Sequence, residues 1–261
     1  MSGPAKSPRF YCPDLSGISA ALPADESHHA RHVLRLGAGD PVELFDGKGV
    51  VAHGRIVTLG KTSAEVAVDD LQRHVRPEPR VHVGFAVPKG KRLDWLLEKV
   101  TELGAASLQP VLFERSVAGG ETLSENTRQR WLGHCIAAAK QCGLEHLPEI
   151  HQPLPALQLP RAWQGCLNVL GEIDPAAPSL REVMGAWTAG RDIGIVIGPE
   201  GDLTAAEKAA LAEAGFSPAR LGHTIMRVET AAIALLAGTI ALCQSPSSQF
   251  NAPQAQSVGD H

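Results

Sequence analysis

The chain has 261 residues, of which 44% are hydrophobic and 20% charged, a balance that excludes a largely disordered protein. The net charge of −4 gives no overall sign of a nucleic-acid binder. The excess of acidic side chains lies in residues 151–261, which carry 6 basic and 10 acidic side chains. Five cysteines without a CxxC pair argue against a disulfide framework or a thiolate zinc site. The longest apolar run, residues 231–243, is too short to span a bilayer, and the N-terminus does not look like a signal peptide. We therefore expect a soluble, cytoplasmic protein with no membrane partner.

Residues 1–76 are predicted to form a small β domain, either a barrel or a compact sheet. A turn rich in glycine at residues 46–49 separates two extended runs, which is typical of a hairpin. The expected strands are residues 42–45, 50–57 and 62–68, and a short helix is expected over residues 25–36. Pro77 and Pro79 remove two backbone donors and favour extended neighbours, so the domain boundary is placed there.

Residues 77–243 are predicted to form an α/β domain, because strands and helices alternate from residue 80 onward. Such alternation is typical of a parallel sheet with helices on its faces. The expected strands are residues 81–87, 107–113, 167–170 and 193–197, and the expected helices are residues 90–103, 124–142, 204–215 and 229–243. Thr204 and Glu207 have the spacing of a capping box. The remaining residues, 244–261, are rich in Ser, Gln and Pro and are expected to be a disordered tail.

A strand that leads into a Gly-rich turn and a helix is the first candidate site, at residues 193–202. Ligands bind beyond the carboxyl ends of parallel strands, and Gly198 and Gly201 would let one approach the backbone. Glu200 argues against a phosphate there, and neither dinucleotide nor P-loop glycine motifs are present. The alternative is a plain strand-to-helix turn.

Two arginines, Arg227 and Arg115, lie next to predicted elements. Arg227 precedes the last helix, and Glu229 lies in its first turn. The positive end of the helix dipole stabilises the negative charge of Glu229 and disfavours the positive charge of Arg227. A surface ion pair is the alternative for Arg227, and capping is the alternative for Glu229. Arg115 follows a buried strand.

Lys89, Lys91 and Arg92 form a basic cluster at a helix start, where they oppose the dipole and could contact an RNA phosphate. A solvated charged turn is the alternative. His28 and His32 have the spacing of a helical metal pair, but no third acidic or Cys ligand is nearby, so no metal is expected. The neighbouring Arg31 and Arg35 are either phosphate contacts or ordinary surface residues.

Seven motifs occur in an order and spacing that resemble one known family. They are HHARHVLRL, LFDG, PKGKRLDWLLEKVTELG, FERS, AAKQCG, IGPEGDLTAAE and LGHTIMRVETAAIALLA. Together they cover about residues 8–243 and resemble the bacterial 16S rRNA (uracil(1498)-N3)-methyltransferases. The resemblance implies a PUA-like β-barrel RNA-binding domain followed by a SPOUT-type methyltransferase domain, with a parallel sheet and a C-terminal trefoil knot. It also implies S-adenosylmethionine as methyl donor, 16S ribosomal RNA or the small ribosomal subunit as substrate, and a homodimer.

The resemblance also implies roles for individual residues. The donor would be bound by residues of three loops, namely Leu170, Gly171, Glu172, Ile197, Gly198, Gly201, Leu221, Gly222, Ile225, Met226 and Thr230. The expected catalytic residues are Arg227, Arg115 and Glu229: an arginine would stabilise negative charge on uracil, and Glu229 would position Arg227 or accept the proton. The expected RNA contacts are Arg31, Arg35, Lys89, Lys91 and Arg92.

Three positions depart from the family pattern: Asp202 replaces a glycine, and Thr224 and Leu144 replace arginines. Two alternatives therefore stay open. The chain could methylate another RNA position, such as a 2′-hydroxyl, or it could be a catalytically idle RNA-binding homologue.

Overall fold

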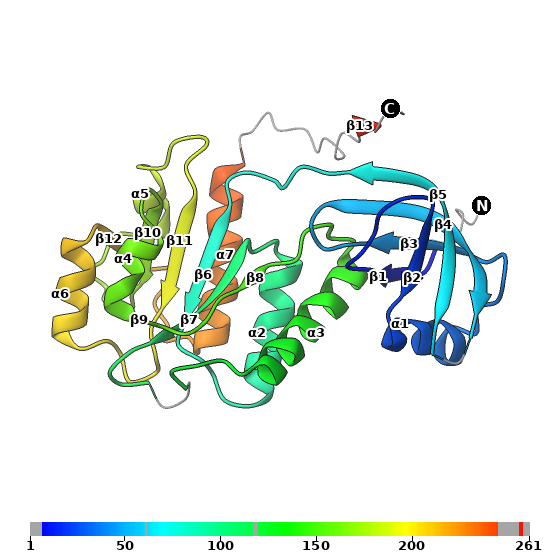
Figure 1. The fold of residues 1–261 in the computed structure, drawn as a ribbon. Coiled ribbons are helices and arrows are strands. Elements are labelled where there is room, and N and C mark those ends of the chain that lie inside the picture. Colours follow the sequence, from blue (N-terminus) through cyan, green and yellow to red (C-terminus); the bar gives the residue numbers. More distant parts are fainter. Residues whose placement is uncertain (1–6, 61, 117–119, 245–255, 258–261) are drawn as a thin grey trace. The chain divides into compact units, whose positions relative to one another are not determined.

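The computed structural model describes residues 7–60, 62–116, 120–244 and 256–257 (Figure 1). The chain divides into two compact units. One comprises Met1–Arg76, Ala139–Leu147 and Phe250–His261, and the other comprises Pro77–Ala138 and Pro148–Gln249. The expected boundary near residue 77 does not account for residues 139–147, which pack with the first unit although they were assigned to the second domain.

The first unit is built on a six-stranded sheet. Its strands are β1 (Arg9–Tyr11), β2 (Ser19–Leu22), β3 (Pro41–Phe45), β4 (Val50–Leu59), β5 (Ala64–Arg73) and β13 (Gln256–Ser257). The strands are ordered β1-β3-β4-β5-β13, with β2 also on β5, and all pairs except β1 with β3 are antiparallel. Alternate apolar residues of the hairpin, such as Val42, Leu44, Ala52 and Ile56, point into one core.

The helix expected over residues 25–36 is shorter and consists of two pieces, α1 (Ala24–His28) and a π-helical turn, η1 (His29–Val33). The tail expected to be disordered over residues 244–261 lies mostly outside the described residues. Gln256–Ser257 differ from that expectation, because they pair with Gln72 and Arg73 at the edge of β5.

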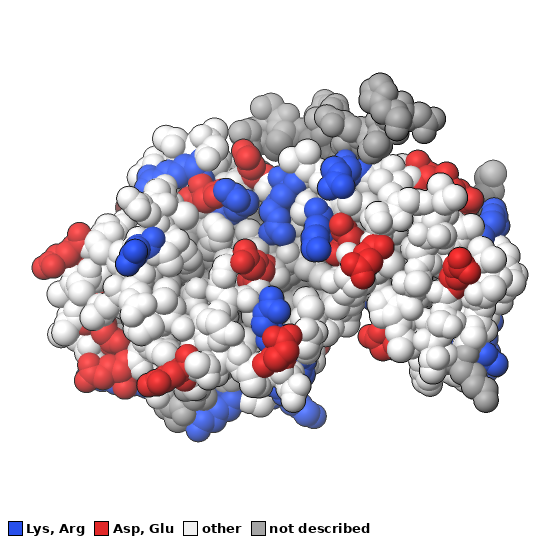
Figure 2. Space-filling model, in the orientation of Figure 1, with Lys and Arg blue, Asp and Glu red and all other residues white. Residues whose placement is uncertain are grey.

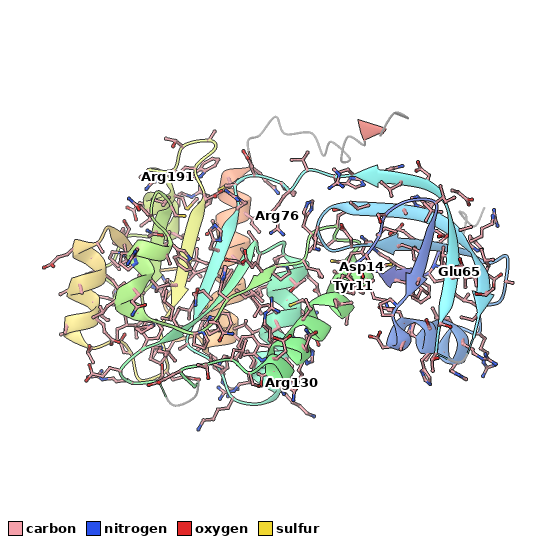
Figure 3. The ribbon with its side chains drawn as sticks, viewed as in Figure 1. Tyr11, Asp14, Glu65, Arg76, Arg130 and Arg191 are labelled. Atoms are coloured by element: carbon pink, nitrogen blue, oxygen red, sulfur yellow. The ribbon has the colours of Figure 1, made fainter. Side chains whose placement is uncertain are left out.

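Polar contacts attach residues 139–147 to the first unit. They are Arg9 Nη2 to the Leu144 carbonyl (2.9 Å), Lys140 Nζ to Glu26 Oε2 (2.6 Å) and Arg76 Nη2 to the Leu147 carbonyl (2.7 Å; Arg76 is labelled in Figure 3). Arg9 and Glu26 are buried; Arg9 also pairs with Glu43 (3.1 Å), whereas Glu26 has its ion-pair partner, Lys140, in this segment, and a buried charge without a partner is costly. The packing of residues 139–147 against the sheet therefore completes the first unit.

The second unit is built on a parallel sheet, which confirms the predicted α/β fold. Its strands are β6 (Val81–Phe85), β7 (Ser107–Leu112), β8 (Glu149–Ile150), β9 (Leu154–Pro155), β10 (Leu167–Gly171), β11 (Ile193–Ile197) and β12 (Phe216–Ala219). They are ordered β12-β10-β11-β6-β7-β8, with β9 also beside β7, and every pair is parallel.

Helices cover both faces of this sheet (Figure 1). They are α2 (Lys91–Glu102), α3 (Glu125–Cys142), η2 (Ala156–Gln158), α4 (Leu159–Ala162), α5 (Leu180–Met184), α6 (Ala205–Glu213) and α7 (Val228–Cys243). On one face α2 packs on α7, and Trp131 of α3 contacts Phe85. On the other face Trp163, after α4, packs over Gly84 and Gly194, where a Cβ would lie 2.8 and 2.4 Å from the indole. No helix in the described part of the chain is long and apolar enough to cross a membrane.

Candidate methyl-donor site

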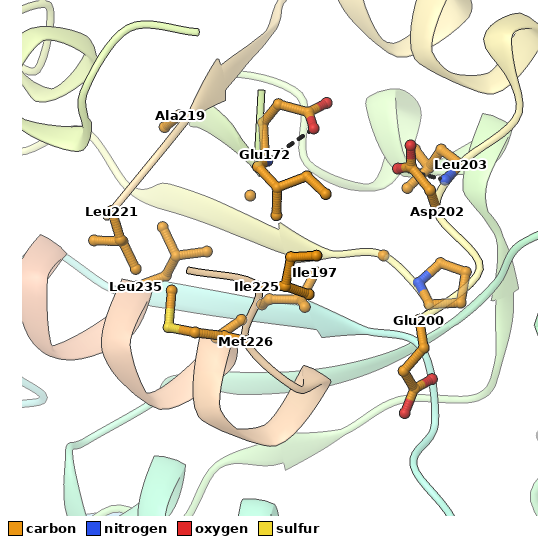
Figure 4. Close-up of a pocket in the computed structure, with 15 residues that line it drawn as sticks. Glu172, Ile197, Glu200, Asp202, Leu203, Ala219, Leu221, Ile225, Met226 and Leu235 are labelled. Atoms are coloured by element: carbon orange, nitrogen blue, oxygen red, sulfur yellow. Dashed lines mark hydrogen bonds between the residues drawn. The ribbon is translucent and has the colours of Figure 1, made fainter. Parts of the chain in front are cut away.

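Three loops meet at one edge of the parallel sheet because β12, β10 and β11 are neighbours. Parallel strands place their carboxyl ends at the same edge, so the loops after residues 171, 197 and 219 converge there. They form a pocket with the start of α7 (Figure 4). Its lining residues are Gly171, Glu172, Ile173, Ile197, Gly198, Pro199, Glu200, Asp202, Leu203, Ala219, Leu221, Ile225, Met226, Ala231 and Leu235.

The pocket has the lining of a small-molecule site, because apolar side chains such as Ile197 and Leu221 stand beside the carboxylates of Glu172 and Asp202. Two glycines keep it open. A Cβ at Gly171 would lie 2.8 Å from Leu235 Cδ1, and one at Gly198 would lie 2.3 Å from Leu203 Cδ1. The backbone at these two positions can therefore approach a ligand as no larger residue would allow.

A lysine joins two of the loops. Lys208 Nζ lies 2.8 Å from Glu172 Oε2 and 2.9 Å from Asp202 Oδ2. Burial alone would raise the pKa of Asp202, but its hydrogen bonds from Lys208 and the Leu203 amide hold that pKa below its ordinary value. Asp202 adopts a φ of +60°, the left-handed region that favours glycine, which explains why glycine suits this position in the family pattern. The bridge is present at neutral pH and is lost as the pH falls through the lowered pKa.

Seven of the eleven expected donor-binding residues line the pocket. They are Gly171, Glu172, Ile197, Gly198, Leu221, Ile225 and Met226. Leu170 does not line the pocket, because its side chain packs in the hydrophobic core with Val196 and Phe216. Gly201, Gly222 and Thr230 belong to the converging segments but do not line the pocket.

The expected catalytic residues occupy different environments. Arg227 is exposed and stands at the N-cap of α7, directly after the lining residue Met226. Arg115 is exposed and donates from Nη1 to the Gly201 carbonyl (3.1 Å). Glu229 is only 4% exposed and does not line the pocket. Among the described residues Arg227 and Glu229 form no ion pair, so the surface pair considered as an alternative is absent there.

A second cavity lies beside the donor pocket. It is lined by Ala86, Val87, Pro88, Lys89, Arg92, Ser116, Pro199 and Glu200, so it shares Pro199 and Glu200 with the first. Arg92 Nη1 lies 3.1 Å from Glu200 Oε1. Lys91 is exposed and does not line it. Lys89 and Arg92, two of the three expected basic contacts, thus line a cavity that adjoins the candidate donor pocket.

The other expected RNA contacts belong to the first unit. Arg31 and Arg35 are both exposed, and Arg31 Nη1 donates to the Leu59 carbonyl (3.3 Å). The rings of His28 and His32 lie 4.5 Å apart, and the described part of the chain contains no group of three ligands suited to a metal ion. Positive and negative side chains are interspersed on the face shown in Figure 2.

The fold and this pocket define an α/β enzyme domain that binds a small molecule at the carboxyl ends of its strands. Residues 76–239 match the model of an RNA methyltransferase domain, and residues 22–69 match that of an RNA methyltransferase PUA domain. The chain belongs to this family of RNA methyltransferases.

Curated relatives carry one common name. The chain is 30% identical to the ribosomal RNA small subunit methyltransferase E of Synechocystis sp., with 87% of this chain and 74% of the relative covered. It is also 30% identical to the protein of that name from Mycobacterium tuberculosis, covering 87% and 88% of the two chains.

Solved structures agree. A ribosomal RNA small subunit methyltransferase E from Neisseria gonorrhoeae, bound to S-adenosyl methionine, is 27% identical with a TM-score of 0.79, covering 91% of this chain and 98% of the other. A methyltransferase from Legionella pneumophila, solved with bound cofactor SAM, is 27% identical with a TM-score of 0.80 and the same coverage.

Proposed function

We propose that this protein transfers a methyl group from S-adenosylmethionine to N3 of a uridine in the 16S ribosomal RNA of the small subunit. The observation that carries the proposal is the pocket formed by the loops after β10, β11 and β12, in a chain of the RNA methyltransferase family. Relatives named as small-subunit methyltransferases support the RNA substrate, and relatives solved with the donor support the cofactor. The protein would act in the cytoplasm.

The pocket residues fit this donor. Ile197, Leu221 and Leu235 offer an apolar surface to an adenosyl group, and the backbone beside Gly198 is open to close approach. The donor's sulfonium is a cation, and the carboxylates of Glu172 and Asp202 line the same pocket. The donor supplies an electrophilic methyl group, and these residues orient it.

The acceptor needs help from the protein because uracil N3 carries a proton at neutral pH. As that proton leaves, negative charge develops over N3, O2 and O4, and a fixed guanidinium would stabilise it. Arg227 and Arg115 are the proposed sources of that charge. The base must also be unpaired, since base pairing uses the N3 edge.

The decisive experiment is a mass-spectrometric map of 16S RNA modifications in a deletion strain. We expect one N3-methyluridine to be lost and to return when purified protein and S-adenosylmethionine are added to the mutant's small subunits. A lost 2′-O-methyl group instead would support the alternative of another RNA position. Calorimetry separates the idle homologue, which would lack the donor affinity expected here.

A phosphate contact at Lys89 predicts a distinct kinetic signature. Lys89→Ala should raise KM for small subunits several-fold and leave kcat nearly unchanged. It should also reduce the slope of log binding constant against log salt concentration by about 1, the effect of losing one phosphate contact. Steady-state kinetics at several salt concentrations measure both effects. Lys208→Ala provides the comparison, because the Lys208 ammonium is bound by two carboxylates in the donor pocket. Its loss should leave the salt dependence of small-subunit binding unchanged. Unchanged KM and salt slope in Lys89→Ala would contradict an RNA contact.

We also propose a homodimer, chiefly from the family resemblance. The apolar stripe of α2 and the helix α7 pack together within one subunit, so their burial does not itself require a partner. Trp95 on α2 stays 45% exposed and offers apolar surface to a second copy. Sedimentation equilibrium at micromolar concentration should give twice the chain mass of 27.6 kDa, and a monomer mass would refute the proposal. The trefoil knot remains a prediction.

A further inference from the structure

Glu200 lies between the donor pocket and the basic cavity and lines both. It follows β11 at the carboxyl edge of the sheet, and its side chain is 47% exposed. Figure 4 shows its carboxylate directed away from those of Glu172 and Asp202. A group placed between the two cavities is in reach of both the methyl donor and whatever base is presented to it.

The partner of Glu200 completes a donor–acceptor pair. Arg92 Nη1 lies 3.1 Å from Glu200 Oε1, and the Arg92 side chain is 37% exposed in the same cavity. The carboxylate can accept a hydrogen bond, while the free nitrogens of the guanidinium can donate. Uracil presents the complementary edge, with a donor at N3–H and acceptors at O2 and O4. Cytosine presents an acceptor at N3 and an amino group at C4, which would meet Glu200 and Arg92 with the polarity reversed.

We propose that Arg92 and Glu200 together recognise the N3 edge of an unpaired uracil, and that Glu200 accepts its N3 proton during methyl transfer. This inference rests on the proposed function. The N3–H bond breaks and its proton goes to a carboxylate oxygen of Glu200. The electron pair left on N3 forms the bond to the methyl carbon, and the methyl–sulfur bond breaks with its pair remaining on sulfur. Glu200 then releases the proton to water.

The surroundings favour Glu200 over the other carboxylates. Glu229 is 4% exposed and lines neither cavity, so uracil cannot reach it. Glu172 and Asp202 line only the donor pocket, whereas Glu200 also lines the basic cavity. The charged groups that line the two cavities with Glu200 are Lys89, Arg92, Glu172 and Asp202. The ordinary alternative is that Arg92 and Glu200 form a surface ion pair of little consequence.

Binding without the methyl donor tests the recognition step. We would measure filter retention of unmethylated small subunits from the deletion strain that carry either uridine or cytidine at the target position, which the modification map locates. The wild-type protein should prefer uridine by about tenfold, the discrimination typical of a charged hydrogen bond that one base makes and the other opposes. Glu200→Gln should lose most of this preference. A wild type that binds both subunits equally, or a variant that keeps the preference, would overturn the recognition role.

Single-turnover methylation at saturating donor tests the proton transfer. Glu200→Gln keeps the side chain's size but cannot accept a proton, so at pH 7 its rate should fall by about 10²-fold. The deficit should shrink as the pH rises toward 9, because hydroxide then removes the N3 proton. RNA that contains 5-fluorouridine, whose N3 proton is more acidic, should likewise reduce the difference in rate between Glu200→Gln and the wild type. Glu200→Asp, which keeps a carboxylate, should recover part of the rate.

A matched control and the donor affinity make the outcome specific. Glu213→Gln changes an exposed carboxylate at the end of α6 and should behave as wild type. Calorimetry should show donor binding by Glu200→Gln within a few-fold of wild type, which separates the acceptor step from the donor pocket. A deficit that stays constant with pH would mean a structural role and would refute proton transfer. If the wild type forms no N3-methyluridine at all, the proposed function fails first, and the two failures are thereby distinguished.

Discussion

Gly198→Val is expected to abolish measurable binding of S-adenosylmethionine. A Cβ at this position would lie 2.3 Å from Leu203 Cδ1, and valine adds two methyl groups beyond it. Leu203 is buried, so it has little room to move except into the pocket. Overpacking of this kind typically lowers folding stability by about 1–3 kcal/mol. The loss of donor binding has a different cause, since a displaced Leu203 side chain would occupy part of the pocket. We expect the dissociation constant measured by calorimetry to rise at least about 100-fold.

The fold should survive this substitution. The φ of Gly198 lies outside the left-handed range, so the backbone accepts an L-residue there. Thermal unfolding should show a cooperative transition shifted by only a few degrees. Gly37→Val is the matched control, because no atom lies within 4 Å of a Cβ at Gly37. Wild-type donor affinity in Gly198→Val would remove this loop from the donor site.

Arg227→Ala is expected to slow methyl transfer by roughly 10²–10³-fold, the range typical of losing one group that stabilises charge in a transition state. Arg227 stands at the positive end of the α7 dipole, where a cation is unfavourable unless it meets negative charge. It follows Met226, which lines the donor pocket. Donor affinity should fall much less than the rate, because the apolar lining and loop backbone remain.

Single-turnover methylation of small subunits at saturating donor measures this effect without contributions from product release. Arg181→Ala, which removes an exposed arginine on α5, serves as the control. A near-wild-type rate in Arg227→Ala would leave Arg227 as an ordinary surface residue. The charge-stabilising role would then be assigned to Arg115, which is bonded to the Gly201 carbonyl of the donor loop.

The long amphipathic elements were predictable because their periodicity is a local property. The stripe of Leu93, Leu96, Leu97 and Val100 is buried along α2, as its spacing predicts. The capping box at the start of α6 is also confirmed, since the Thr204 hydroxyl accepts from the Glu207 amide and the Glu207 carboxylate accepts from Thr204. Such patterns act within one or two turns and do not depend on the rest of the fold.

The short strand β12 was not predictable, and part of the pocket depends on it. The four residues of β12, Phe216–Ala219, include Pro218 and show no alternation long enough to recognise. They become a strand by pairing with β10, from Asn168↔Phe216 to Gly171↔Ala219. Ala219 therefore reaches the pocket through tertiary pairing.

The position of Leu170 illustrates the same limit at a single residue. A motif places residues 170–172 at a strand end, but the strand's register decides which side chains face the pocket. Leu170 pairs with Val196 of β11, and both side chains belong to the same hydrophobic cluster. Gly171, one residue further, borders the pocket.

The insertion of residues 139–147 into the first unit also has a consequence for the order in which the protein forms during translation. The strands β1 to β5 leave the ribosome early, but Arg9, Glu26 and Arg76 have partners between residues 140 and 147. About 70 further residues must be synthesised before those partners exist, which takes roughly 4–14 s at typical bacterial elongation rates. During that interval the buried charges of Arg9 and Glu26 lack these contacts. Residues 139–147 therefore join the amino-terminal unit only after residues 77–138 of the methyltransferase unit have been synthesised.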